Sequence, residues 1–127
     1  MAENNNIGPK RLVVGAHYGL RDWLSQRVTA IVMAVFTVIL LIAFLTGKNF
    51  TYQGWAGLFA STWGGLPVMK LLTFVTFVAL TWHAWVGVRD IWMDYVKPVG
   101  IRLALQVFTV FWLLACVVYA GLILLKV

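Results

Sequence analysis

The sequence predicts an all-α membrane protein with three transmembrane helices. Of its 127 residues, 62% are hydrophobic and only 11% are charged, whereas soluble domains are about 45–50% apolar and about 25% charged. Three stretches of the chain also lack any charged residue, and each reaches the roughly 18–20 residues that a helix needs to cross the hydrocarbon core. This length allows one domain and no separate catalytic domain, so we expect partner subunits to supply most of the chemistry.

Charged residues bound each predicted span. Residues 28–47 lie between Arg27 and Lys48, residues 71–88 between Lys70 and Arg89, and residues 103–125 between Arg102 and Lys126. Residues 1–27 form a polar N-terminal head, in which 17–27 is expected to be a short helix that leads into the first span. Residues 28–127 then form a single membrane anchor domain.

A short helix is expected between the first two spans. Its aromatic residues Tyr52, Trp55, Phe59 and Trp63 recur every three or four positions, which places them along one face of a helix. Aromatic side chains favour the membrane–water boundary, so this helix is expected to lie in the interface. Gly64, Gly65 and Pro67 should end it before the second span.

The basic residues decide the orientation in the membrane. Seven fall in the head or between the second and third spans: Lys10, Arg11, Arg21, Arg27, Arg89, Lys97 and Arg102. Three fall on the other side: Lys48, Lys70 and Lys126. The positive-inside rule therefore places the N-terminus in the cytoplasm and the C-terminus outside. The net charge of +6 is explained in the same way, and no nucleic-acid partner is expected.

His83 is the one ionisable residue well inside a predicted span. At 1.5 Å per residue it lies about 9 Å from the inner end and about 20 Å from the outer end. Ala79, His83 and Gly87 share a helix face, where small residues leave room for a porphyrin or for a closely packed helix. His83 is therefore a candidate haem ligand, proton relay or structural histidine. Two axial histidines would require a second chain.

Polar groups near the inner ends of the spans are further candidates. Arg21 and Arg27 could pair with haem propionates, or serve only as topology charges. Asp94 and Tyr95 follow the second span, and they point in different directions if the helix continues. A phenol that donates a hydrogen bond, beside a carboxylate that relays protons, suits the reduction of a quinone. A plain polar interfacial loop is the alternative. Pro98 is expected to end this segment and turn the chain.

Together these residues resemble a known family. It is the smaller hydrophobic membrane anchor of succinate dehydrogenase, the succinate:quinone oxidoreductase of respiratory complex II. The resemblance runs from about Asp22 to the C-terminus. Its most specific part is His83-Ala84-Trp85-x-Gly87 followed by Asp94-Tyr95-Val96-Lys97-Pro98; Arg21-Asp22-Trp23 through Arg27-Val28-Thr29-Ala30-Ile31 and Arg102-Leu103-x-Leu105-Gln106 are similar to the starts of the family's first and third spans.

The resemblance implies a site for each cofactor. His83 would be one axial ligand of haem b, and the partner anchor, a cytochrome b-type membrane protein, would supply the other. Arg27 would face a haem propionate. Tyr95 would hydrogen-bond a ubiquinone carbonyl, with Asp94 in the proton path. Some bacterial relatives carry His-Asp where this chain has Arg21-Asp22, so the cation is kept but its titration near neutral pH is lost.

The resemblance also implies a place in a larger complex. An iron–sulfur subunit and a flavoprotein subunit would dock on the cytoplasmic face of a bacterial inner membrane, and this chain would carry no succinate-oxidising residue. Two alternatives stay open, a fumarate reductase anchor and a small non-redox membrane protein that uses His83 as a proton relay. The choice between ubiquinone and menaquinone also stays open.

Overall fold

The computed structural model describes residues 16–47 and 51–127, with side chains from residue 19 onward in the first of these ranges. Four helices form there: α1 (Ala16–Thr46), α2 (Tyr52–Ala60), α3 (Val68–Tyr95) and α4 (Val99–Lys126). By length and composition α1, α3 and α4 can each cross a membrane. The predicted all-α fold, with three spans and a short helix between the first two, is confirmed.

The three long helices extend past the charge-free stretches that predicted them. α1 begins at Ala16 and continues through Arg27 into the apolar stretch, so the helix expected over 17–27 is its first part. α3 continues past Arg89 to Tyr95, which places Asp94 and Tyr95 in its last turn. Charge limits which residues lie in lipid, but long side chains at a helix end reach water without breaking the helix.

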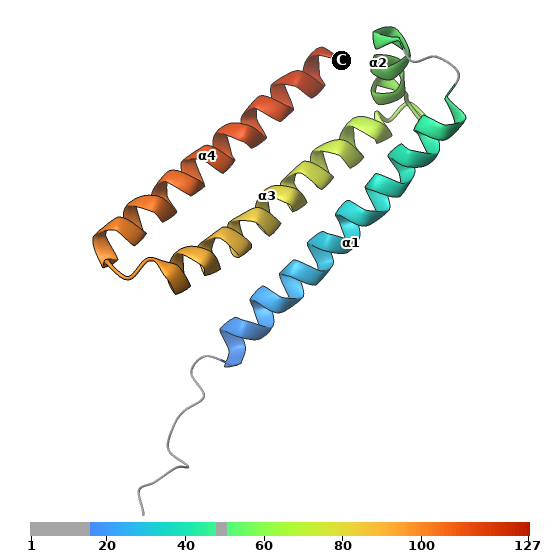
Figure 1. Ribbon diagram of the computed structural model, residues 1–127. Coiled ribbons are helices and arrows are strands. Elements are labelled where there is room, and N and C mark those ends of the chain that lie inside the picture. The colour runs from blue at the N-terminus through green and yellow to red at the C-terminus, as the bar shows by residue number, and fades with distance from the viewer. Residues whose placement is uncertain (1–15, 48–50) are drawn as a thin grey trace, which may run out of the picture.

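The long helices are arranged as a row in which α3 lies between α1 and α4 (Figure 1). Neighbouring helices of the row run antiparallel (Figure 1), and between α3 and α4 the connection is very short. Few side chains become buried in such a row. Among the described residues only Val86, 2% exposed, and Thr29, 9% exposed, count as buried. Most large apolar side chains of the three helices therefore face outward, toward lipid or partner subunits.

Polar contacts fix the register of α1 against α3. The Gln26 amide donates to the backbone carbonyl of His83 over 3.0 Å, and the Thr29 hydroxyl lies 3.0 Å from His83 Nδ1. Nearer the N-terminal end of α1, Asp22 forms an ion pair with Arg89. Such contacts hold helices together in lipid, where apolar burial gives little preference for protein over lipid.

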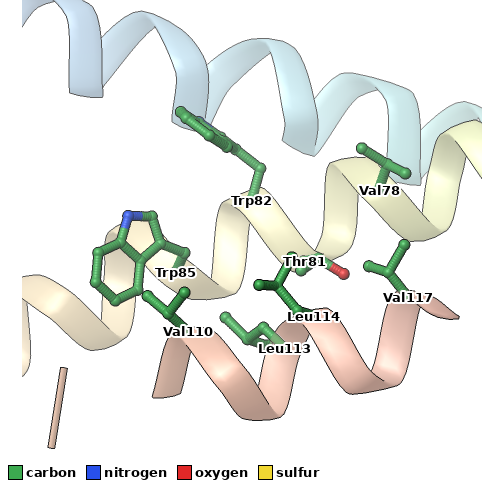
Figure 2. A pocket seen from close by; sticks show the side chains of 8 residues that line it. All are labelled: Val78, Thr81, Trp82, Trp85, Val110, Leu113, Leu114 and Val117. Carbon is green, nitrogen blue, oxygen red and sulfur yellow. The ribbon is translucent and has the colours of Figure 1, made fainter. Parts of the chain in front are cut away.

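One polar contact and a mostly apolar surface join α3 to α4. The Trp92 indole N–H donates to the Thr109 hydroxyl over 3.2 Å. A methyl group added at Gly121 would lie 3.7 Å from the Phe74 ring, so the start of α3 and the end of α4 also lie close together. Between these ends is an apolar hollow of about 330 Å³, shown in Figure 2. It is lined by Val78, Thr81, Trp82, Trp85, Val110, Leu113, Leu114 and Val117.

α2 is held by its cap and by aromatic stacking. The Thr51 hydroxyl accepts a hydrogen bond from the Gly54 amide over 3.2 Å, as an N-cap residue does. Trp55 stacks on Phe44 of α1, with ring centroids 6.2 Å apart, and on Phe59 at 6.4 Å. The short helix is thereby anchored to the end of α1 and lies against α3 (Figure 1).

The predicted aromatic stripe is partly wrong, because Trp63 lies outside α2. The helix ends at Ala60, and the Ser61 hydroxyl donates to the Leu58 carbonyl over 2.8 Å. Trp63 instead pairs with Leu66 through two backbone hydrogen bonds, of 2.9 and 3.1 Å, across a tight turn. Gly64 and Gly65 occupy that turn with φ of 58° and 82°, a conformation that favours glycine.

Pro98 forms the turn between α3 and α4, as predicted. α3 ends at Tyr95, and α4 begins at Val99 with Pro98 as its N-cap at φ −66°. Proline suits the start of a helix because its missing N–H would have no partner there. The end of α3 and the start of α4 are thus joined by a very short connection.

Candidate functional site

His83 faces α1 and forms hydrogen bonds with it at two points. Its ring Nδ1 lies 3.0 Å from the Thr29 hydroxyl, and its backbone carbonyl accepts the bond from Gln26. Thr29 is buried, so water does not compete for this contact. His83 was a candidate haem ligand, proton relay or structural histidine, and the structure shows the hydrogen bonds to a neighbouring helix that a structural histidine makes. That bond uses one ring nitrogen and leaves the other for a second role.

The second ring nitrogen of His83, Nε2, is accessible. His83 is half-buried, and among the described residues no buried side-chain nitrogen or oxygen lacks a hydrogen-bond partner. Since the hydrogen bond of the ring is at Nδ1, Nε2 must reach the molecular surface. Nε2 is also one of the two atoms through which a histidine binds a metal.

There is open space at Gly87, on the same face of α3 as His83. One turn after His83, a methyl group added to Gly87 would meet no atom within 4 Å. The face of Ala79, His83 and Gly87 thus combines close packing against α1 at Thr29 with free room at Gly87. A flat ligand fits such a face, and the donor available to it is a single imidazole nitrogen. His83 is the one histidine whose side chain the structure describes, so a second axial histidine is not found in that part of the chain.

Arg89 connects α3 to α1 through a small ion-pair network. Its guanidinium pairs with Asp22 of α1 and with neighbouring Asp90, the latter over 3.0 Å. The side chains of Arg89 and Asp22 are only 30% and 33% exposed. Arg89 and Asp90 thus form an ion pair between adjacent residues, and Asp22 is a partner from α1 that the sequence did not predict. These ion pairs join α3 to the first part of α1.

A polar hollow of about 680 Å³ opens beside this network. Its polar wall combines two guanidinium groups with three carboxylates, and its apolar wall comes from α3. The lining residues are Arg21, Asp22, Trp82, Trp85, Val86, Arg89, Asp90, Met93 and Asp94. Two residues singled out from the sequence, Arg21 and Asp94, therefore face the same space. The volume would accept a ring-sized ligand with polar substituents.

Tyr95 and Arg27 do not line this hollow. Tyr95 is 81% exposed at the end of α3, and it diverges from Asp94 as adjacent helical residues must. Arg27 lies over the Trp23 ring at 5.5 Å. It is two residues before Thr29, or about 200° around α1 from the side that meets His83. The structure thus brings Arg21 and Asp94 together but leaves Arg27 and Tyr95 on outward surfaces.

Some residues used in the predictions lie outside the described part of the chain. Lys10, Arg11 and Lys48, which entered the count of basic residues, are among them, as is the side chain of His17.

Sequence reasoning missed the residues that position the histidine. Gln26 and Thr29 are three residues apart and so share a helix face. They are also polar side chains beside and inside a predicted span, where polar groups need partners. Those two signals could have identified them as the face that meets His83. No comparable signal pairs Asp22 with Arg89, because that contact depends on the register between helices.

Fold and site together define a class of protein. It is a small membrane protein with three spans, with a histidine on α3 that is hydrogen-bonded to α1 and with a polar hollow near the start of α1. Residues 1–119 match the family described as succinate dehydrogenase/fumarate reductase transmembrane subunit. The chain is similar to the succinate dehydrogenase hydrophobic membrane anchor subunit of Coxiella burnetii (strain RSA 493 / Nine Mile phase I), with 34% identity over 102 residues, or 80% of this chain and 84% of that protein. This chain therefore belongs to the family of succinate dehydrogenase/fumarate reductase transmembrane subunits.

Proposed function

We propose that this chain is the anchor that holds haem b with a partner anchor and completes a quinone site in a succinate dehydrogenase. Family membership supports the general role. The observation that carries the finer proposal is His83, which is tied to α1 through Nδ1 while Nε2 stays accessible beside the open space at Gly87. A histidine held in this way is prepared to ligate a metal from one side.

The haem proposal assigns roles to three residues of this chain. His83 would supply one axial nitrogen, and the partner anchor, a cytochrome b-type membrane protein, would supply the other. Arg21 and Arg27 would hold the propionates, since guanidinium groups bind carboxylates strongly. Both precede Thr29 in α1; Arg21 lines the polar hollow, and Arg27 lies on the outward surface beside Trp23. When bound, a haem would supply a one-electron redox centre next to the quinone site.

The quinone proposal rests on the end of α3. The Tyr95 phenol would donate a hydrogen bond to a quinone carbonyl, and Asp94 would pass protons toward the reduced ring. Asp94 lines the polar hollow, which offers a route to water. Because Tyr95 is so exposed, the opposite wall of the quinone site would come from partner subunits. We propose ubiquinone as the acceptor, with menaquinone as the alternative.

The remaining assignments concern orientation and assembly. The N-terminus and the α3–α4 connection would face the cytoplasm of a bacterial cell, and the C-terminus would lie outside. The iron–sulfur and flavoprotein subunits would then dock at the ends of the helices that carry Asp94 and Tyr95. Electrons from succinate would reach the quinone through those subunits, and this chain would position their acceptor.

Loss of haem on substitution of His83 tests the proposal. The complex is purified through a tag on this chain, and the co-purifying subunits are identified. Reduced-minus-oxidised spectra should then show a b-type band that His83→Ala abolishes. Substitution of the single cysteine, Cys116→Ala, provides a control that should keep the band. A complete, active complex without haem, or His83→Ala with the band intact, would contradict the assignment.

A second candidate, a fumarate reductase anchor, is favoured by the family description, which covers both enzymes. The two differ in the preferred direction of electron flow. Rates of succinate oxidation with ubiquinone and of fumarate reduction with menaquinol, measured on the same purified complex, separate them. A clear excess of the second rate would identify a fumarate reductase.

A further inference from the structure

The Thr29 hydroxyl has one proton and three neighbours that could accept it. The carbonyl oxygens of Ser25 and Gln26 lie at 2.7 and 3.2 Å, and His83 Nδ1 lies at 3.0 Å. Carbonyl oxygens only accept, whereas an imidazole nitrogen either accepts or donates according to its tautomer. Where the hydroxyl proton goes therefore decides which nitrogen of His83 carries hydrogen.

Other threonines in this chain indicate where that proton goes. Each makes the bond to the carbonyl four residues earlier that is characteristic of threonine in helices, at 2.7–2.8 Å. They are Thr37, Thr46, Thr73, Thr76, Thr81 and Thr109. Thr29 makes the same bond to Ser25, over 2.7 Å. Its proton is thus committed to the backbone, and a lone pair faces His83.

Thr109 is a precedent within the same molecule. Its hydroxyl donates to the Leu105 carbonyl over 2.7 Å and lies 3.2 Å from the Trp92 indole nitrogen. An indole N–H only donates, so the Thr109 oxygen must be the acceptor. Thr29 has the same arrangement, with Ser25 in place of Leu105 and His83 in place of Trp92.

We propose that Thr29 is a positioning residue that fixes His83 in the tautomer with hydrogen on Nδ1, so that Nε2 presents its lone pair to the haem iron. The inference rests on the proposed haem ligation and adds the residue that prepares the ligand. Metal-binding histidines commonly donate their other N–H to a fixed acceptor, which sets the ring orientation and raises its basicity. Here the acceptor is a hydroxyl on a neighbouring helix.

The environment strengthens this assignment. Thr29 is 9% exposed, so water cannot easily replace its oxygen as the acceptor. Gln26, one turn earlier on α1, binds the His83 backbone carbonyl and fixes the position of the residue in α3. The ring is thus held by its backbone and by Nδ1, and Nε2 is the atom left to meet a ligand.

The experiment compares Thr29→Val with Thr29→Ser in the purified complex. Valine has nearly the same shape but no hydroxyl, whereas serine keeps the acceptor. For Thr29→Val we expect haem affinity to fall about 10–100-fold, measured as haem transfer to an excess of a haem-free globin. The haem midpoint potential should rise, because a less basic imidazole stabilises the ferric state less, and the low-spin signal in electron paramagnetic resonance should shift. Thr29→Ser should keep wild-type values.

The outcomes separate this inference from the proposed function. If His83→Ala loses the haem but Thr29→Val keeps the wild-type affinity and potential, the positioning role of Thr29 is refuted and haem ligation stands. If His83→Ala keeps the haem, both fail. Should Thr29→Val not assemble, Thr29→Cys takes its place, since a thiol is a weaker acceptor. A haem midpoint potential above that of the wild type and of Thr29→Ser would then support the role, and an unchanged potential would refute it.

Discussion

Adjacent residues at the end of α3 differ sharply in their surroundings. Asp94 lines the polar hollow with Arg21, whereas Tyr95 projects outward and is mostly exposed. Because α3 is still helical there, the two side chains cannot meet the same point of a ligand unless the ligand bridges them. The proposed quinone, with its ring against Tyr95 and with Asp94 passing protons along the hollow, would satisfy this geometry.

Substitution of these two residues should slow quinone reduction to different extents. Asp94→Asn should lower the rate of ubiquinone reduction by about 100-fold, as loss of a proton-transfer group does. Tyr95→Phe should lower it by about 5-fold through the loss of one hydrogen bond, worth about 1 kcal/mol. Succinate oxidation with a soluble dye, which takes electrons before the quinone site, is the control and should not change. Native ubiquinone rates in both variants would remove this end of α3 from the site.

Sequence reasoning identified His83 at this scale but not its partner. The histidine was evident because ionisable residues are rare inside a span. Thr29 was not, since threonines occur throughout these helices and most only bond their own backbone. Thr29 differs from them through its contact with His83, and that contact depends on how α1 and α3 pack.

Each helix pair is joined by a polar contact that the sequence did not reveal. The bond from Trp92 to Thr109 joins α3 to α4, and the pair of Asp22 with Arg89 joins α1 to α3. Helix lengths follow from local composition, so they could be predicted. Register requires knowing which faces meet, and the apolar residues around these long helices leave that choice to a few polar groups.

Loss of the Thr109 hydroxyl should weaken the α3–α4 pair. Thr109→Val removes the acceptor of the Trp92 indole and leaves a half-buried N–H without a partner, at a cost of about 1–2 kcal/mol. Thr37→Val is the matched control, because the exposed Thr37 bonds only the Met33 carbonyl. Denaturant unfolding of the purified complex in detergent measures both. Equal effects of the two substitutions would show that the indole bond contributes nothing.

The ion pair between α1 and α3 should show coupling in a double-mutant cycle. Asp22→Asn and Arg89→Gln are made singly and together, and the free energy of unfolding is measured for each. We expect a coupling energy of about 1 kcal/mol, at the upper end for partly exposed pairs. Increasing salt should reduce it, because exposed charges are screened. A coupling indistinguishable from zero would mean that Gln26 and Thr29 alone set the register.

The whole molecule has almost no interior of its own. A row of three helices leaves two broad faces uncovered, and only Val86 and Thr29 are buried among the described residues. This agrees with the composition, since a chain with 62% hydrophobic residues has far more apolar surface than three helices can hide from one another. Lipid and partner subunits must cover the rest.

Orientation in the membrane can be tested by labelling single cysteines. With Cys116 replaced by alanine, Lys97→Cys lies between α3 and α4, and Ser61→Cys lies just after α2. A membrane-impermeant maleimide should label position 97 only in inverted vesicles and position 61 only in intact spheroplasts. The positive-inside count predicts this pattern, and the opposite labelling would reverse the proposed topology.

The placement of α3 in the middle of the row has a consequence for biogenesis. Thr29 precedes α3 along the chain, and its bond to Ser25 satisfies the hydroxyl within α1 before α3 is available to pair with it. Thr29 can contact His83 only after α3 has packed against α1, because the two residues are 54 positions apart in the sequence. The proposed haem would accordingly be loaded at His83 late in maturation, after α1 and α3 have paired.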